Sequence, residues 1–142
     1  MRRPLLAVGI ILTAGSLTFP SGTAAQRGLA SEKAAGVHII EGPALESATD
    51  SSAIIRWTTN NPGGSDLHYA IMHYGTAPQN LARTSRSPNR RNRNQPSMTF
   101  RVRVDGLKPG TTYYYSVESV QANGIPDGVT SPVKRFTTPQ HP

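Results

Sequence analysis

Residues 107–117 read LKPGTTYYYSV, and this is the most specific structural pattern in the chain. The segment 105–110 just before the tyrosines holds two glycines and a proline, a composition typical of a tight corner. After the corner, Tyr113, Tyr115 and Val117 recur at every second position, which is the side-chain period of a β-strand. A corner that leads into a strand with one large apolar face predicts a β-structure at this point.

The same alternation of apolar and polar residues recurs through most of the chain. Trp57 falls on the apolar face of one run and Phe100 on the apolar face of another. Clusters of Gly, Pro, Asn, Asp and Ser separate the runs, and no segment predicts a helix. Strands are expected over residues 37–43, 52–58, 67–75, 79–86, 98–104, 112–120 and 129–138. Seven short strands within about 100 residues predict an all-β fold, a seven-stranded immunoglobulin-like antiparallel β-sandwich.

Alternation also predicts which side chains lie between the two sheets. In the run 98–104, Phe100 and Val102 share one side of the strand, whereas Arg101 and Arg103 share the other. Because charged side chains are rarely buried, the apolar side is expected to face the core. The residues expected to form this core are Ala53, Ile55, Trp57, Tyr74, Phe100, Val102, Leu107, Tyr113, Tyr115, Val117 and Phe136.

The first 25 residues have the organisation of a secretory signal peptide. Arg2 and Arg3 carry positive charge, residues 5–12 (LLAVGIIL) are almost wholly apolar, and small residues lead up to Ala25. We expect cleavage between Ala25 and Gln26. The alternative is a retained membrane anchor, but the apolar stretch of about 15 residues is shorter than the roughly 20 that span a bilayer. The expected organisation is a signal peptide at 1–25, a flexible leader at 26–36, the sandwich domain at 37–139 and a tail at 140–142.

Composition excludes several classes of site. The 142-residue chain has no cysteine, which rules out disulfides, thiolate metal sites and a cysteine nucleophile. It is basic, with 15 Lys and Arg against 8 Asp and Glu and a formal net charge of +7. Because removal of the signal peptide takes only two of the basic residues, the mature protein is also expected to be basic.

Three motifs together resemble a fibronectin type III domain over residues 37–139. Residues 107–113 fit the L-x-P-x-T-x-Y corner of that family, residues 53–57 fit its A-x-I-x-W strand, and residues 131–138 fit its closing strand. The chain is closer still to the N-terminal sandwich domain of purple acid phosphatases, whose V-x-Y-G-T pattern resembles residues 72–76 (MHYGT). The resemblance implies that the hydroxyl of Tyr113 bonds to nearby backbone. It does not imply phosphatase activity, because the GD-x-x-Y, GNH and GH-x-H metal motifs of the catalytic domain are absent from this sequence.

The remaining residue patterns give no support to catalysis or to a cofactor. The histidines closest in sequence, His68 and His73, are five positions apart, so on a regular strand they face opposite sides and do not share a metal ion. Neither the G-x-S-x-G pattern of a nucleophile elbow nor a phosphate-binding P-loop occurs. We therefore expect no enzyme activity, no cofactor and no metal.

An excess of arginine between two acidic residues is the one unusual feature of the composition. No acidic residue lies between Asp66 and Asp105, and the polar segment 87–97 is expected to form a loop. Like charges repel, so such a segment is either a solvated loop or a site for an anion, to which guanidinium groups are well suited. The arginines of this candidate site are Arg83, Arg86, Arg90, Arg91, Arg93, Arg101 and Arg103.

These observations predict an exported binding module that is secreted or periplasmic and has no transmembrane span in its mature form. Its partner is expected to be a protein, an anionic polysaccharide or an anionic lipid surface. Nucleic acid is not expected, since the arginine-rich segment has no aromatic residue on which bases would stack. Two alternatives stay open: an accessory domain related to or partnering a purple acid phosphatase-type metallophosphoesterase, and a structural component of the cell envelope.

Overall fold

The computed structural model describes residues 32–141, so the expected signal peptide and its cleavage point between Ala25 and Gln26 lie outside the described residues. The described part of the chain forms strands and no helix, and it therefore has no helix long and apolar enough to cross a membrane. The strands are β1 (Ile39–Ala48), β2 (Ser52–Asn60), β3 (Leu67–Gly75), β4 (Arg83–Arg90), β5 (Ser97–Asp105), β6 (Thr112–Gln121), β7 (Pro126–Thr130) and β8 (Lys134–Thr137).

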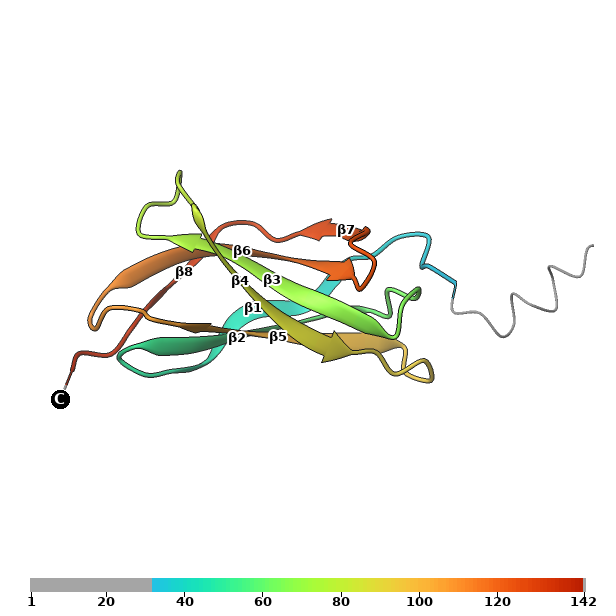
Figure 1. Ribbon diagram of the computed structural model, residues 1–142, viewed down its shortest axis with the longest axis horizontal. Coiled ribbons are helices and arrows are strands. Elements are labelled where there is room, and N and C mark those ends of the chain that lie inside the picture. Colours follow the sequence, from blue (N-terminus) through green and yellow to red (C-terminus); the bar gives the residue numbers. More distant parts are fainter. Residues whose placement is uncertain (1–31, 142) are drawn as a thin grey trace, which may run out of the picture.

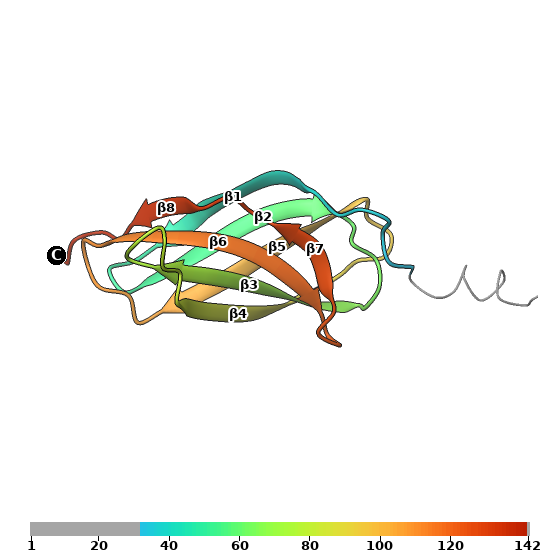
Figure 2. The same cartoon turned by 90° about the horizontal axis from the view of Figure 1, so that it is seen from above.

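Two antiparallel sheets pack face to face (Figure 1). One sheet has the strand order β1-β2-β5, and the other has the order β4-β3-β6-β7, with β8 also paired to β6. In the view of Figure 2, β3 and β6 lie in front of β2 and β5. The predicted all-β, immunoglobulin-like sandwich is confirmed.

The closing strand is broken in two, so the described chain has eight strands where seven were expected. The break falls at residues 131–133, between β7 and β8. Pro132 has no N–H to donate to a sheet. Next to it, the hydroxyl of Ser131 accepts a hydrogen bond from the backbone N–H of Val117 at 2.9 Å, which takes the place of a regular ladder contact.

The facing sides of the sheets hold a cluster of buried apolar side chains. Burial alternates with the strand period along β2 and β5, whose partners Trp57 and Phe100 stack with ring centroids 5.4 Å apart. From the other sheet, the ring of Tyr113 lies 5.7 Å from that of Phe136. The eleven residues named above as core candidates are all in this cluster, together with Ala70, Met72, Met98 and Val104.

The first strand runs through the point where the sequence suggested its end. Gly42-Pro43 was expected to terminate it, but β1 continues to Ala48, so that expectation is wrong. The pairing of β1 with β2 shifts in register between Glu41 and Ala44, and this irregularity accommodates a proline that has no N–H for the ladder.

The fourth strand lies four residues later than expected and joins the two sheets at one side. It was expected at 79–86, with a loop from 87, whereas β4 runs to Arg90. The side chains of Ser85, Ser87 and Asn89 bond to the backbone of Arg101 and Arg103 on β5, over distances of 2.5–3.1 Å. Three polar side chains of β4 thus satisfy backbone groups at the outer edge of the other sheet.

The segment before β1 is attached to the domain, in contrast to the flexible leader expected over 26–36. The N–H of Ala34 donates to the carbonyl of Pro62 at 2.9 Å, and that of Gly64 donates to the carbonyl of Glu32 at 3.2 Å. The Nζ of Lys33 donates to Oδ1 of Asp127 on β7. Residues 32–36 are therefore held against the sandwich, and residues 26–31 lie outside the described range.

Candidate functional site

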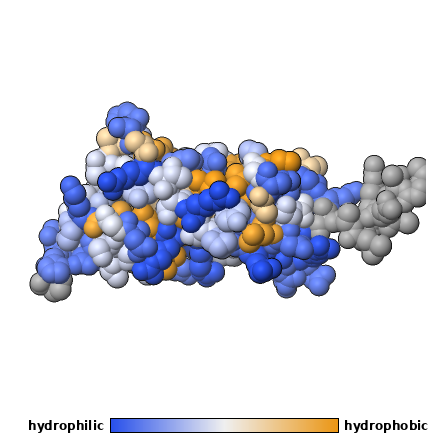
Figure 3. Space-filling view, viewed as in Figure 1, coloured by the Kyte–Doolittle hydropathy of each residue, from blue (hydrophilic) through white to orange (hydrophobic). Residues whose placement is uncertain are grey.

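The arginines named as a candidate anion site are distributed over β4, the turn after it and β5, so they do not form one loop. Arg83, Arg86 and Arg90 lie on β4 and are exposed, and none of them forms an ion pair within residues 32–141. The guanidinium of Arg86 lies 3.7 Å above the ring of Tyr69 on the neighbouring strand β3. Figure 3 shows strongly hydrophilic side chains along the diagonal that β4 follows in Figure 1, with apolar patches between them.

Arg91 has a structural role, and this corrects the expectation that it forms part of an exposed anion site. Only 8% of the residue is exposed. Its guanidinium donates to the carbonyl oxygens of Ser65 and Gly64, both at 3.0 Å, and to Oδ1 of Asn61 at 3.2 Å. These bonds hold the turn between β2 and β3, and they leave the side chain little capacity for a ligand.

Arg93 is paired with Asp66, the acidic residue that precedes the arginine-rich segment in the sequence. Two guanidinium nitrogens of Arg93 lie 2.8 Å from the two carboxylate oxygens of Asp66. The hydrogen bond from Arg93 lowers the pKa of Asp66 below its ordinary value, and it raises the pKa of Arg93. The positive charge of Arg93 is thus largely balanced within the fold.

The two arginines of β5 also have acidic partners. Nε of Arg101 lies 2.9 Å from Glu46 on β1, and its hydrogen bond lowers the pKa of that carboxyl group. Nε of Arg103 lies 3.0 Å from Asp105 on the same strand. Both arginines are therefore on the outer face, as the alternation predicted, but both are engaged in ion pairs.

Half of the lysines and arginines in the described residues form no ion pair, because nearly all acidic groups already have a partner. Glu41 pairs with Arg56, Glu118 lies 3.4 Å from His73, and Asp50 lies 2.5 Å from His141. Asp127 is buried, and it bonds to Lys33 and His68. The cations that form no ion pair in the described part of the chain are Arg83, Arg86, Arg90, Lys108, Lys134 and Arg135.

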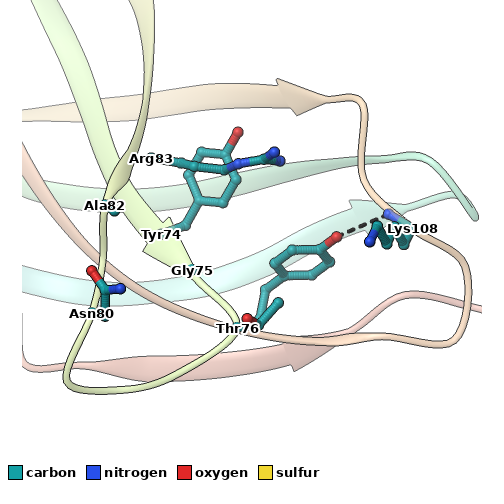
Figure 4. Close-up of a pocket in the computed structure, with 8 residues that line it drawn as sticks. Tyr74, Gly75, Thr76, Asn80, Ala82, Arg83 and Lys108 are labelled. Atoms are coloured by element: carbon teal, nitrogen blue, oxygen red, sulfur yellow. Dashed lines mark hydrogen bonds between the residues drawn. The ribbon is translucent and has the colours of Figure 1, made fainter.

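A pocket of about 280 Å³ opens where the β3–β4 turn meets the β5–β6 corner, and two of these cations line it. The cations are Arg83 and Lys108, and no acidic residue belongs to the lining. In the view of Figure 4, the Arg83 side chain extends past the ring of Tyr74 toward the side on which Lys108 lies. Arg83 was among the arginines expected at a site, whereas Lys108 and Tyr74 were not, because they come from segments far apart in the chain.

The histidines do not converge on a common centre. His68 is fully buried on β3, with Nδ1 2.9 Å from Asp127 and Nε2 3.0 Å from the carbonyl of Gly63, whereas His73 lies at the surface. Among residues 32–141 there is no group of three or more His, Cys, Asp or Glu arranged to hold a metal ion. The buried pair of His68 and Asp127 was missed by the sequence analysis, since Asp127 lies in a stretch that resembles an ordinary turn.

The corner at residues 107–113 has the contact expected of it. The hydroxyl of Tyr113 accepts a hydrogen bond from the backbone N–H of Lys108 at 2.9 Å, which is the tyrosine corner of immunoglobulin-like sandwiches. Residues 41–138 match the model of the protein family described as Purple acid Phosphatase, N-terminal domain. The chain belongs to this family. The purple acid phosphatase N-terminal domain family accounts for all eight strands except the first two residues of β1.

Two solved structures with TM-scores of 0.50 and 0.51 show the same fold. The sensor domain of the anti-sigma factor RsgI4 from Pseudobacteroides cellulosolvens is similar with a TM-score of 0.51 and 20% identity, over 75% of this chain and 92% of that chain. A second structure of that sensor domain has a TM-score of 0.50 and 22% identity, over 74% and 96%. The 6th fibronectin type III domain of human fibronectin type III domain containing protein 3 matches with a TM-score of 0.45 and 20% identity, over 78% and 93%. A search of curated protein sequences found no match.

Proposed function

We propose that this purple acid phosphatase N-terminal-like domain is an exported, non-catalytic module that binds an anionic polysaccharide along β4. The observation that carries the proposal is the presence of arginines without ion pairs on this exposed strand, in a fold where most other cations are paired. Arg86 and Arg90, which we call the β4 arginine pair, are the residues on which binding is expected to depend.

The geometry of the β4 arginine pair suits an extended polymer. Strand residues rise about 3.3 Å each, so Arg86 and Arg90 stand roughly 13 Å apart along β4. A ligand that contacts both must present negative groups at intervals over that length, as an acidic polysaccharide does. Stacking on Tyr69 fixes the plane of the Arg86 guanidinium and leaves its N–H edges free for carboxylate or sulfate groups.

Retention on immobilised heparin tests this proposal. The double variant Arg86→Gln/Arg90→Gln is expected to elute at clearly lower salt than the wild-type domain. The matched control is Arg101→Gln/Arg103→Gln, which removes the same charge from side chains that are already paired with Glu46 and Asp105. Equal shifts for the two double variants would show that retention depends on net charge alone and would contradict the proposed surface.

A second candidate function comes from the family itself. A domain of this family is a candidate accessory domain that packs against a metallophosphoesterase encoded beside it. Co-purification with such an enzyme, and a gain in the enzyme's stability when the domain is added, would support this function. The domain alone is expected to release no phosphate from a chromogenic phosphate ester.

Export is part of the first proposal and has a direct test. The composition of residues 1–25 favours a signal peptide that is cut after Ala25. N-terminal sequencing of the protein recovered from outside the cytoplasm is expected to begin at Gln26. A protein that keeps Met1 and remains in the cytoplasm would contradict export.

A further inference from the structure

We propose that the pocket between the β3–β4 turn and the β5–β6 corner binds a doubly charged tetrahedral oxyanion, a phosphate or sulfate group, between Arg83 and Lys108. This site is at a different place from the β4 arginine pair and uses different residues. It goes beyond the proposed function, because a small anion can occupy this pocket whether or not a polymer binds along β4.

Charge is the first argument for an anionic ligand. Arg83 and Lys108 form no ion pair within the described residues, and the pocket lining contains no carboxylate. The acidic residue nearest in sequence to this corner, Asp105, is engaged by Arg103. The pocket therefore holds two positive charges, and a phosphate group, which carries about −1.5 to −2 at neutral pH, would balance them.

Hydrogen-bond donors are the second argument. The lining adds the hydroxyl groups of Tyr74 and Thr76 and the side-chain amide of Asn80 to the two cations. Only 7% of Tyr74 is exposed, and its side chain forms part of the pocket wall. An oxyanion has several acceptor oxygens and can receive bonds from such donors together with the guanidinium fork.

The walls of the pocket are held in place by the fold. The backbone of Lys108 is tied to the hydroxyl of Tyr113 at 2.9 Å, and this bond lies at the edge of the pocket in Figure 4. On the other wall, the N–H of Asn80 donates to the carbonyl of Ala77 at 3.1 Å. A Cβ at Gly75 would lie 2.2 Å from the carbonyl oxygen of Asn80, so only glycine lets the turn fold back this closely.

The pocket has room for a small oxyanion. The pocket volume of about 280 Å³ lies just below the roughly 300–1,000 Å³ of pockets that hold drug-sized molecules. A single phosphate or sulfate group fits such a volume, either as the free ion or as the end group of a larger molecule that stays outside. The two sources share the same chemistry at the protein surface.

Titration followed by backbone amide NMR tests the site directly. Sodium sulfate, sodium phosphate and sodium acetate are added in separate series, with sodium chloride adjusted to keep the ionic strength constant. Sulfate and phosphate are expected to give saturable shifts at Gly75, Thr76, Asn80 and Lys108. Acetate, with one negative charge, is expected to bind at least about tenfold more weakly, because it loses the second charge-assisted contact.

Substitutions separate this site from general charge effects. Arg83→Gln and Lys108→Gln are each expected to weaken sulfate binding about tenfold, since each removes one charge-assisted hydrogen bond. Arg135→Gln removes an exposed arginine of β8 that also forms no ion pair in the described part of the chain, and it is expected to leave sulfate affinity at the pocket unchanged. The amide spectrum of each variant also shows whether it is folded. Shifts that do not saturate, or an affinity that survives in the Arg83→Gln/Lys108→Gln double variant, would overturn the proposal.

A vesicle arm of the experiment distinguishes the two sources of the anion. Phosphatidylcholine vesicles with and without phosphatidate, which presents a terminal phosphate, are sedimented with the wild-type and the double variant. Binding that needs phosphatidate and both cations supports the site with a membrane-borne phosphate as ligand. Saturable binding of free ions without vesicle binding supports the site with a soluble ligand. The absence of both would overturn the proposal, whereas heparin retention through the β4 arginine pair can hold or fail independently.

Discussion

Arg91 stabilises the β2–β3 turn by donating hydrogen bonds to two of its backbone carbonyls and to the side chain of Asn61. The planar guanidinium directs its donors along fixed lines, so several acceptors in one turn can be reached at once. The side chain also lies 3.4 Å from Asp66, which balances part of its charge. A residue with these contacts contributes to folding and has few donors left for a ligand.

Arg91→Lys is expected to destabilise the domain by about 2 kcal/mol. A lysine keeps the positive charge but cannot reach all of these acceptors, so the partly buried carbonyls of Gly64 and Ser65 lose their partners, at about 1–3 kcal/mol each. Urea unfolding followed by Trp57 fluorescence measures the change. The control is Arg90→Lys at the adjacent exposed position, where the change is expected to stay within about 0.5 kcal/mol. A similar stability for both variants would contradict the structural role of Arg91.

Strand β4 closes one side of the sandwich. Its side chains, rather than its backbone, form the hydrogen bonds to the backbone of β5. Asn89 donates to the carbonyl of Arg101 at 3.0 Å and accepts from its N–H at 3.1 Å, and Ser87 accepts from the N–H of Arg103 at 3.1 Å. An open edge of this kind is a template for pairing with another chain. Because β4 occupies it, this edge of the β1-β2-β5 sheet is protected without any further strand.

Two reciprocal substitutions test this closure. Asn89→Ala is expected to speed hydrogen exchange of the Arg101 amide by about tenfold or more while the Arg103 amide keeps its wild-type rate. Ser87→Ala is expected to do the reverse, because each side chain protects a different N–H on β5. Each variant is thus the control for the other. Equal acceleration of both amides in either variant would indicate general opening of the edge and would contradict the side-chain pairing.

The sequence predicts strands well where one face is buried and poorly where it is not. Along β2 and β5, apolar residues alternate with polar ones, and the burial of Trp57 and Phe100 follows directly from that pattern. Along β4, the inward positions hold Ser85, Ser87 and Asn89, which carry no apolar periodicity, so its start was misplaced by four residues. Hydrophobic alternation cannot locate a strand whose inner face bonds to backbone.

The sequence shows which charged residues the candidate site contains, but it does not show which of them form ion pairs. An excess of arginine is visible in the sequence, but the partner of Arg101 is Glu46, 55 positions away and on another strand. Ion pairs between distant strands depend on register, which one sequence does not fix for residues on solvent-facing sides. For the same reason, the sequence did not predict the pocket. Its cations Arg83 and Lys108 come from two separate turns that the fold brings together.

Asp127 on β7 joins the segment before β1 to strands β3 and β6 of the second sheet. Its carboxylate accepts from Lys33, from the hydroxyl of Ser119 at 2.5 Å and from His68 at 2.9 Å. Burial on its own raises the pKa of Asp127, but the hydrogen bonds from His68, Lys33 and Ser119 outweigh burial, and the pKa lies below its ordinary value. The charged form of Asp127 is therefore the one that stabilises the fold.

A lowered pKa in the folded state makes this stabilisation pH-dependent in a defined direction. The contribution of Asp127 is fully present above the pKa of the unfolded state, about 3.9, and it is lost as the pH falls through the lower folded value. Asp127→Asn is expected to lower the free energy of unfolding by about 1–3 kcal/mol at pH 5, and the difference from wild type is expected to shrink below about pH 4. Urea unfolding between pH 5 and pH 2 measures both effects.

Asp105→Asn, at an exposed position, is the control and is expected to change stability by less than about 0.5 kcal/mol. A difference between wild type and Asp127→Asn that stays constant down to pH 2 would show that the charge of Asp127 does not stabilise the fold.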